Sequence, residues 1–232
     1  MRSARGVLTL TRVTDTEQRD AANRLVRSIE ASTGIHDPRI LRAFRKVPRE
    51  RFVPEELADF AYEDRALPIG DGQTISQPSM LALMLAALAP TATDRALEVG
   101  AGSGYAAALL GELTENVEAL EIRPELAGRA ERTLAALGVE NVHVHVKDGA
   151  LGLPEQAPFD IVLVSAGARA TPPELVEELR IGGRIAIPVG DSAGQHLFLG
   201  RREPNGELVW EQRTPCVFVP LVREHAPRDL TP

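Results

Sequence analysis

The sequence is poor in cysteine, in long apolar runs and in positive charge, and each shortage excludes a class of protein. Its single cysteine, Cys216, permits neither an internal disulfide nor a zinc site made of cysteines alone. Glycine, proline or a charged residue interrupts every apolar run well before about 18 residues, so no segment predicts a membrane-spanning helix. The 26 basic residues are outnumbered by 33 acidic ones, and the net charge of -7 disfavours binding to a nucleic-acid backbone.

The basic residues also form no stripe that could overcome this charge. Their densest group spans residues 39–51, and Glu50, Glu55 and Glu56 lie within or just after it, which indicates a solvated helix face. Near the N-terminus the apolar stretch covers only residues 7–10, whereas the apolar region of a signal peptide needs about 7 to 15 residues. We therefore expect a cytoplasmic, monomeric protein without a nucleic-acid or membrane partner.

What the sequence does contain is an alternation of strand and helix patterns. The chain has 232 residues, 44% of them apolar and 25% charged, as in an ordinary globular protein. The alternation runs from about residue 94 to 190 and predicts a mostly parallel sheet covered by helices on both faces. The expected strands are residues 96–99, 117–122, 142–146, 159–164 and 184–189, followed by an antiparallel pair at 195–201 and 208–218. The expected helices are residues 79–88, 105–113, 124–137 and 172–179.

The part of the chain before this alternation predicts helices and a long loop. Helical spacing covers residues 15–34, and Asp37-Pro38 begins a second helix with a cap and a first-turn proline. Residues 48–76 have little regular pattern apart from a short helix near residues 55–60. A loop of that length inside a compact domain is usually functional.

A glycine-rich turn follows the first expected strand. Residues 100–104 read Gly-Ala-Gly-Ser-Gly, and such small residues let the backbone approach a ligand at a helix N-terminus. The spacing differs from the G-x-G-x-x-G of nicotinamide enzymes, because the third glycine comes one residue early and Tyr105 follows it. Glu98, just before the turn, would repel a pyrophosphate. The turn therefore favours a nucleotide that is cationic or free of phosphate.

Acidic residues stand at the ends of three successive expected strands. Glu98 lies at the first, and Glu121 ends the second, where a carboxylate can accept hydrogen bonds from both ribose hydroxyls. Asp148-Gly149 follows the third, where an acid can bind an adenine amine. The carboxyl ends of these strands meet around one crevice. This set resembles the S-adenosylmethionine site of class I methyltransferases.

Two other groupings predict neither a nucleophile nor a metal site. Ser103 lies in Ala-Gly-Ser-Gly, which does not match the G-x-S-x-G motif of hydrolases. His143 and His145 share a strand face, but no third ligand lies near them in the sequence. We therefore expect no metal.

Three motifs resemble those of the protein-L-isoaspartate (D-aspartate) O-methyltransferases. They are Val-Pro-Arg-Glu-Arg-Phe-Val-Pro at residues 47–54, Gln-Thr-Ile-Ser-Gln-Pro at 73–78 and Phe-Val-Pro-Leu at 218–221. The resemblance runs from about residue 20 to 225. It implies a class I methyltransferase fold, Rossmann-like and doubly wound, with an N-terminal helical cap and antiparallel C-terminal strands. It also implies methyl transfer from S-adenosylmethionine to the side-chain carboxylate of L-isoaspartyl residues for protein repair, with D-aspartyl residues as further candidates.

The same resemblance suggests how the chain is divided. We expect one methyltransferase domain at residues 15–225, between a loose extension at 1–14 and a tail at 226–232. Within the domain the expected parts are a helical cap with the substrate loop at 15–78, the cofactor-binding core at 79–190 and the C-terminal strands at 191–225.

The resemblance further implies roles for individual residues. A carboxylate acceptor is ionised at pH 7 and needs no general base, so the enzyme has to align it with the donor methyl group and exclude water. Ser76 matches the active-site serine of the family and would orient the acceptor. Cofactor binding is expected of Thr74, Ile75, Glu98, Gly100, Gly102, Ser103, Gly104, Glu121, Ile122, Asp148 and Gly149. Substrate binding is expected of Gln73, Ser76, Val219, Pro220 and Leu221, with isoaspartyl-containing peptides and damaged proteins as partners.

The sequence departs from the family pattern at two places. Ser79-Met80 follows the 73–78 block where the family often has a bulky residue, and Ala168-Arg169-Ala170 stands where it usually reads Ala-Pro. Arg169 could therefore alter the acceptor preference. Three other functions stay open on the sequence alone: carboxylate methylation of a dedicated biosynthetic peptide, non-catalytic binding of S-adenosylmethionine, and nicotinamide-dependent oxidoreduction.

Overall fold

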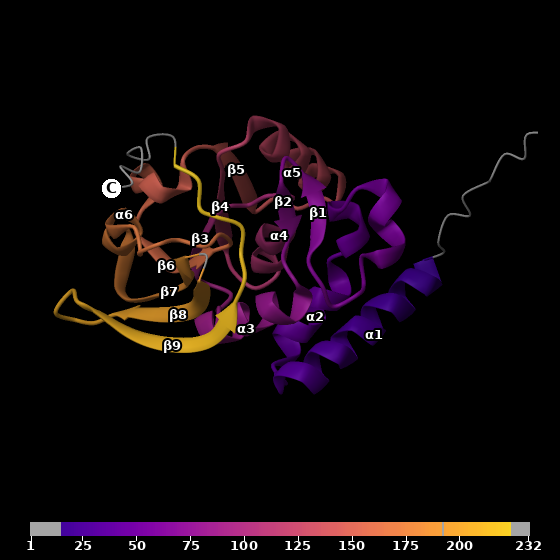
Figure 1. Cartoon of the computed structure of the whole chain (residues 1–232), viewed down its shortest axis with the longest axis horizontal. Helices are drawn as coiled ribbons and strands as arrows, with labels where there is room; N and C mark the ends of the chain where they lie inside the picture. Colours follow the sequence, from indigo (N-terminus) through magenta and orange to yellow (C-terminus); the bar gives the residue numbers. More distant parts are fainter. Residues whose placement is uncertain (1–14, 192, 224–232) are drawn as a thin grey trace, which may run out of the picture.

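One seven-stranded sheet organises the fold (Figure 1). The computed structural model describes residues 15–191 and 193–223, so the expected extension at 1–14 and tail at 226–232 lie outside it. The strand order is β5-β4-β3-β6-β7-β8-β9, with parallel pairing from β5 to β7 and antiparallel pairing of β7, β8 and β9. The strands are β3 (Arg95–Val99), β4 (Asn116–Glu121), β5 (Val142–Val146), β6 (Phe159–Val164), β7 (Leu179–Asp191), β8 (Gly194–Arg202) and β9 (Leu208–Cys216). The predicted sheet is confirmed, including its antiparallel end.

Six α-helices surround this sheet in the described part of the chain. They are α1 (Asp15–Thr33), α2 (Pro38–Lys46), α3 (Pro78–Leu88), α4 (Tyr105–Gly111), α5 (Pro124–Ala136) and α6 (Pro173–Glu177). In Figure 1, α1 and α2 lie at the right, while the β8–β9 pair extends to the left. Helix α2 begins as predicted, because the Asp37 side chain accepts the Arg39 N–H and Pro38 occupies the first turn.

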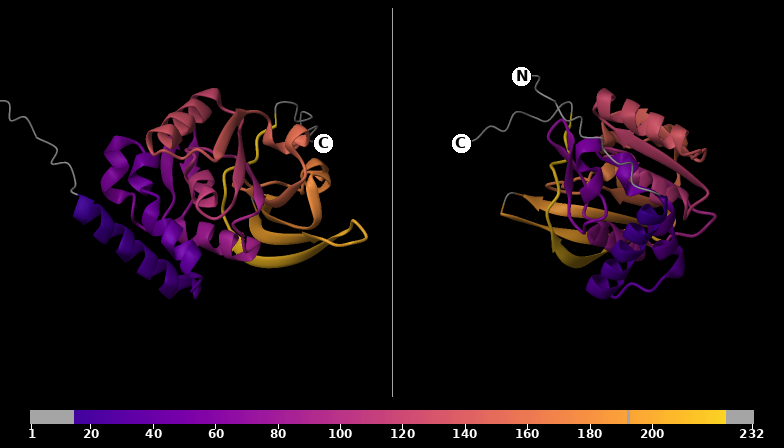
Figure 2. Two further views of the ribbon diagram at one scale, coloured as in Figure 1. Left: turned by 180° about the vertical axis from the view of Figure 1, so that it is seen from behind. Right: turned by 90° about the vertical axis from the view of Figure 1, so that its right-hand side faces the viewer.

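The two faces of the sheet bury two separate apolar clusters. Ala96 of β3 belongs to the cluster that includes Leu85 of α3 and Leu109 of α4. Its neighbour Leu97 points to the opposite face and joins the cluster that includes Leu175 of α6. Since successive side chains of a strand alternate between faces, the continuous apolar runs of the core strands are explained by burial on both sides. Figure 2 shows helices on either side of the sheet.

The expectation of a long loop at residues 48–76 is corrected by the structure. The segment contains two 3-10 helices, Arg49–Phe52 and Glu55–Phe60, and two short strands, β1 (Leu67–Gly70) and β2 (Gln73–Ile75). The strands pair with each other in antiparallel fashion and form a sheet of their own, separate from the main one. We call residues 67–75 the hairpin.

The hairpin has a tight turn and very short strands. Gly70, Asp71 and Gly72 have φ angles of 94°, 52° and 70°, and glycine tolerates this left-handed region best. Strands of four and three residues are shorter than the runs from which alternation can be recognised. The hairpin therefore leaves almost no signal in the sequence.

Strand β7 is longer than expected. It begins at Leu179 and continues through Gly182-Gly183, where the sequence suggested a turn, because a register irregularity between Phe159 and Ile161 of β6 absorbs the extra residues. Helix α6 is correspondingly shorter, ending at Glu177. In the described ranges no helix is both long and apolar enough to cross a bilayer.

Candidate active site

The hairpin, the glycine turn and the end of β6 meet around a small cavity of about 30 Å³, which we call the crevice. Residues from all three segments line it, together with Leu81 and Tyr105 from the helices α3 and α4. The predicted site residues that it brings together are Thr74, Ile75, Ser76, Glu98, Gly100, Gly102 and Ser103. The structure thus places the proposed acceptor-binding serine and much of the proposed cofactor site in one place.

The backbone of the glycine turn is held against its neighbours at two points. Gly102 has φ of 54°, its N–H donates to the Glu121 carboxylate at 2.8 Å, and a Cβ there would lie 3.2 Å from Ile69 of the hairpin. Gly104 has φ of 86°, and a Cβ there would lie 3.0 Å from the side chain of Ala130. Both glycines are therefore required by conformation and by close packing.

The Glu98 side chain is completely buried, and within the described part of the chain only one of its two carboxylate oxygens has a hydrogen-bond partner. Its Oε1 accepts a hydrogen bond from the Ser165 hydroxyl at 3.0 Å, whereas Oε2 has no hydrogen-bond partner in the described structure. Burial raises the pKa of this carboxyl to about 8; the Ser165 hydrogen bond opposes the shift, and the charge of Glu121 adds to it. A buried carboxyl with one free oxygen is suited to bind a cationic group. The sequence did not single out Ser165, since one serine after an apolar strand resembles any loop residue.

Glu121 supports the turn from the end of β4. One of its oxygens accepts the Gly102 N–H and the other accepts the Arg123 N–H at 2.9 Å, so the carboxylate is fixed before any ligand arrives. Glu121 and its neighbour Ile122 are not among the residues that line the crevice. They lie beside it, one hydrogen bond away from the glycine turn.

Asp148 and Gly149 also lie outside the lining of the crevice. Asp148 is buried, and its side chain accepts the Ala150 N–H at 2.9 Å at the start of a short 3-10 helix. A Cβ at Gly149 would lie 2.6 Å from the Val99 side chain, so the backbone packs directly on β3. The three acidic residues therefore have different positions. Glu98 lines the crevice, whereas Glu121 and Asp148 accept hydrogen bonds from the backbone around it.

Ser76 lies between β2 and α3 and is held there by a residue that the sequence analysis did not identify. The residue at the N-cap of α3, Gln77, makes no capping hydrogen bond of its own. Instead, one carboxylate oxygen of Asp64 accepts a hydrogen bond from the backbone N–H of Ser79 at 2.8 Å. The other oxygen accepts one from the side-chain Nε2 of Gln77 at 3.3 Å. Asp64 thus caps the helix from a distant part of the chain and fixes the residues next to Ser76.

Arg49 stabilises the segment that carries Asp64. The expected solvated face at residues 39–51 is wrong at this position, because Arg49 is 0% exposed. Its guanidinium donates to the Arg65 carbonyl at 3.2 Å and lies 4.9 Å from the centre of the Tyr105 ring, and burial lowers its pKa. Arg49 thus connects the 3-10 helix at Arg49–Phe52 with the segment before the hairpin and with the start of α4.

Replacing Asp64 by alanine is expected to lower kcat for the acceptor and to reduce the free energy of unfolding by about 1 kcal/mol, the usual contribution of a helix cap. The cause is loss of the cap on α3, which leaves the neighbouring Ser76 less firmly placed. Steady-state kinetics and urea unfolding measure the two effects. Asp64→Asn, which keeps an acceptor oxygen, should restore most of both, and an unchanged kcat in Asp64→Ala would show that Asp64 does not position Ser76.

The C-terminal residues 218–221 run beside the end of β6. The Gly167 N–H donates to the Val219 carbonyl, and the Leu221 N–H donates to the Gly167 carbonyl, both at 2.8 Å. Gln195 of β8 fixes the segment further, since it accepts the Phe218 N–H at 2.8 Å. Val219, Pro220 and Leu221 therefore lie next to the segment that carries Ser165, but they do not line the crevice. Gln73 likewise lies on β2 outside its lining.

Sheet order, glycine turn and buried acid together define the class I S-adenosylmethionine-dependent methyltransferase fold, and solved structures agree. A solved protein-L-isoaspartate O-methyltransferase is 30% identical, with a TM-score of 0.78, over 86% of this chain and 65% of that one. A second, a putative protein-L-isoaspartate O-methyltransferase from Plasmodium falciparum in complex with S-adenosyl-L-homocysteine, is 25% identical with a TM-score of 0.74, over 88% and 98% of the two chains.

The family follows from the sequence comparisons. The model of the protein-L-isoaspartate(D-aspartate) O-methyltransferase family matches residues 20–226. The protein-L-isoaspartate O-methyltransferase of Roseiflexus sp. strain RS-1 is 52% identical over 83% of this chain and 88% of its own length. Protein-L-isoaspartate O-methyltransferase 1 of Syntrophobacter fumaroxidans is 50% identical over 80% of this chain and 87% of its own length. The chain belongs to this family, as the motifs at residues 47–54, 73–78 and 218–221 predicted.

Proposed function

We propose that the protein transfers a methyl group from S-adenosylmethionine to the free carboxylate of L-isoaspartyl residues in peptides and damaged proteins. The observation that carries the proposal is the meeting of Ser76 with Glu98 and the glycine turn in one crevice. Family membership supports the reaction, and the relatives that are named for it share about half of their residues with this chain.

The residues around the crevice fit the donor by their chemistry. The unpartnered Oε2 of Glu98 would accept a hydrogen bond from its amino group, and the glycine turn would let its backbone come close. Glu121 and Asp148, at the next two strand ends, would bind the ribose hydroxyls and the adenine amine. When bound, S-adenosylmethionine supplies a methyl group on a positively charged sulfur. Within the described residues no cluster of three or more metal-binding side chains exists, and the proposed chemistry needs none.

The role of the protein in the reaction is to orient the acceptor. An isoaspartyl carboxylate is ionised at pH 7, so no general base has to remove a proton before it attacks. The Ser76 hydroxyl would donate a hydrogen bond to one carboxylate oxygen and leave the other directed at the methyl group. The apolar side chains of Ile75 and Leu81 line the same crevice and would exclude water, which would otherwise compete for the acceptor.

The substrate segment beyond the acceptor is proposed to pass along the C-terminal residues. Val219, Pro220 and Leu221 form a wall beside residues 165–168, within reach of a peptide whose carboxylate enters the crevice. Gln73, at the start of β2, is proposed to contact the same substrate segment. We propose further that the protein acts as a monomer in the cytoplasm.

A methyl-transfer assay tests the proposed function. The protein is incubated with labelled S-adenosylmethionine and a pair of peptides that differ only in having an L-isoaspartyl or a normal aspartyl residue. The expected result is a base-labile methyl ester on the isoaspartyl peptide alone. Cofactor binding without any ester would favour the non-catalytic reading, and thermal stabilisation by NAD would favour an oxidoreductase. Ester formation only on a peptide encoded beside the gene would favour a dedicated biosynthetic substrate.

A further inference from the structure

A second cavity lies outside the crevice. It has a volume of about 350 Å³ and lies between helix α5 and the 3-10 helix at Arg49–Phe52. The apolar side chains of Phe52, Val53, Ile69 and Leu126 form part of its walls. We call it the arginine pocket, because Arg51, Arg129 and Arg132 also line it.

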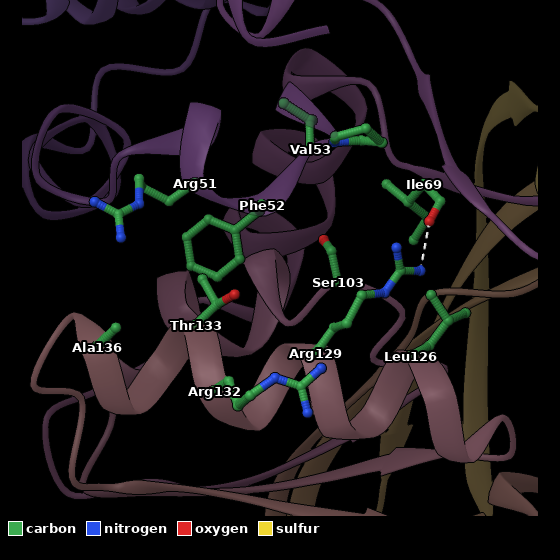
Figure 3. A pocket seen from close by; sticks show the side chains of 11 residues that line it. Arg51, Phe52, Val53, Ile69, Ser103, Leu126, Arg129, Arg132, Thr133 and Ala136 are labelled. Atoms are coloured by element: carbon green, nitrogen blue, oxygen red, sulfur yellow. Dashed lines mark hydrogen bonds between the residues drawn. The ribbon is translucent and has the colours of Figure 1, made fainter. Parts of the chain in front are cut away.

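The three arginines come together although the protein as a whole is acidic, with a net charge of -7. Arg129 and Arg132 project from α5, and Arg51 lies on the opposite wall, with its guanidinium directed away from the other two arginines (Figure 3). In Figure 3, Phe52 and Ser103 lie between Arg51 and Arg129. Three positive charges around one hollow create a local potential that attracts an anion, whatever the sign of the net charge.

One of these arginines already has partners, and two do not. Arg129 donates to the Ile69 carbonyl at 2.6 Å and lies 3.9 Å from the Asp71 carboxylate, so it fixes the hairpin against α5. Arg51 and Arg132 are exposed, and neither forms an ion pair or a side-chain hydrogen bond in residues 15–191 and 193–223. Their guanidinium groups are therefore available to a ligand, whereas the role of Arg129 is to hold the hairpin.

The position of the arginine pocket connects it with the acceptor. Ser103 lines both the pocket and the crevice, and Ile69 lies against the glycine turn that separates them. An extended peptide advances about 3.3 to 3.6 Å with each residue. A peptide whose carboxylate occupies the crevice can therefore place the side chain of a residue a few positions away in the neighbouring pocket.

We propose that the arginine pocket binds an acidic side chain, Asp or Glu, of the acceptor peptide itself, within four residues of the isoaspartyl residue. The proposal rests on the proposed function, since it assigns a specificity subsite to the same reaction. The apolar walls would contact the methylene groups of the acidic side chain, and Arg51 and Arg132 would bind its carboxylate.

A tethered acid fits the pocket better than a free anion. The two available guanidinium groups are exposed to water, where a single ion pair stabilises a complex only weakly. A free phosphate would have to overcome its own loss of translational freedom for that small gain. An acid carried by an already bound peptide enters at a high effective concentration, so the same weak contact changes the affinity measurably.

Peptide variants and arginine variants together test the subsite. One isoaspartyl peptide is made with Glu or Gln at each of the four positions on either side of the isoaspartyl residue, and KM and kcat are measured at low ionic strength. We expect Glu to lower KM by about threefold to fivefold at one or two positions with kcat unchanged, as an exposed ion pair allows. High salt should remove the difference.

Arg51→Gln and Arg132→Gln should each reduce this preference for Glu without changing KM for the Gln peptides. Arg201→Gln serves as the matched control, because Arg201 is an exposed arginine on β8 and far from the pocket along the sheet. All three changes are at exposed positions, and a thermal unfolding scan confirms that the variants fold.

Equal KM values for Glu and Gln at all positions would overturn the subsite, and so would a preference for Glu that both pocket variants retain. Either result leaves the proposed function intact, since the isoaspartyl peptides would still be methylated. If wild-type protein methylates none of these peptides, the proposed function fails, and the subsite fails with it.

Discussion

Ser76→Ala is expected to lower kcat by about 100-fold, the usual effect of misplacing a reacting group by about 1 Å, because the acceptor carboxylate loses the hydroxyl that orients it. Affinity for S-adenosylmethionine should stay unchanged. The reason is that the Ser76 hydroxyl is proposed to orient the acceptor carboxylate, while Glu98 and the glycine turn are proposed to bind the donor. Single-turnover methylation of an isoaspartyl peptide measures the first quantity, and calorimetric titration with S-adenosylhomocysteine measures the second.

The control for this variant is Ser32→Ala, which removes a hydroxyl from the exposed face of α1, where it bonds only to the Ile29 carbonyl. It should leave kcat unchanged. A loss of cofactor affinity in Ser76→Ala equal to its loss of kcat would contradict the assignment and make Ser76 a residue of the donor site. A normal kcat would show that the acceptor is oriented by other groups.

Glu98→Gln is expected to weaken binding of S-adenosylhomocysteine by about 30-fold or more, because a buried hydrogen-bonded charge pair typically contributes at least about 2 kcal/mol. In the wild type the pKa of Glu98 is raised to about 8, so a cationic ligand group has to displace its proton at neutral pH. Wild-type affinity should therefore rise between pH 6.5 and 8.5, by at most about tenfold for each pH unit. Glutamine cannot ionise, so the variant should lose this rise.

The same change should have the opposite effect on the stability of the free protein. Because the pKa of Glu98 is raised from 4.5 to about 8 on folding, the folded state binds more protons than the unfolded state between these values. The contribution of Glu98 to the free energy of unfolding therefore becomes less favourable as pH rises through this window, and it is least favourable above about pH 8. Glu98→Gln removes that penalty, so it should raise Tm most at high pH.

Calorimetry at pH 6.5, 7.5 and 8.5 and thermal unfolding at the same values measure both effects. Any titration of the ligand itself is common to both proteins, so only the difference between wild type and variant reports on Glu98. The matched control is Glu112→Gln, which changes a surface carboxylate that pairs with Lys46. A parallel pH dependence in wild type and Glu98→Gln would show that Glu98 does not bind the cation.

The core of the fold could be predicted from sequence because its signals are local. The strands β5 and β6 have the predicted bounds, since each is a short stretch rich in β-branched residues that polar, glycine or proline residues delimit on both sides. Glu98 was identified for a similar reason, because strand, glycine turn and helix follow one another directly in the chain. The position of Ser76 required the resemblance to a family, since a serine before Gln77-Pro78 is otherwise an ordinary helix cap.

The residues that were missed act over long distances in the sequence. Asp64 caps α3 across 15 residues, and Ser165 meets Glu98 across 67. Burial of Arg49 depends on Tyr105, which belongs to a different element. Nothing local distinguishes these side chains from solvated ones, and only the packing of the elements brings them together. The arginine pocket could not be predicted for the same reason, because its walls come from four separate segments.

The separate sheet of the hairpin has a consequence for the order of events in catalysis. The hairpin lies against the glycine turn, since a Cβ at Gly102 would lie 3.2 Å from Ile69, and Thr74 and Ile75 line the crevice beside Glu98. Because its ladder is closed on itself, movement of the hairpin would break no hydrogen bond of the main sheet, but it would break the one from Arg129 to the Ile69 carbonyl. A peptide lying across the closed hairpin would then keep the donor in place. We expect a compulsory order with the donor first, in which an unreactive peptide analogue inhibits uncompetitively against S-adenosylmethionine.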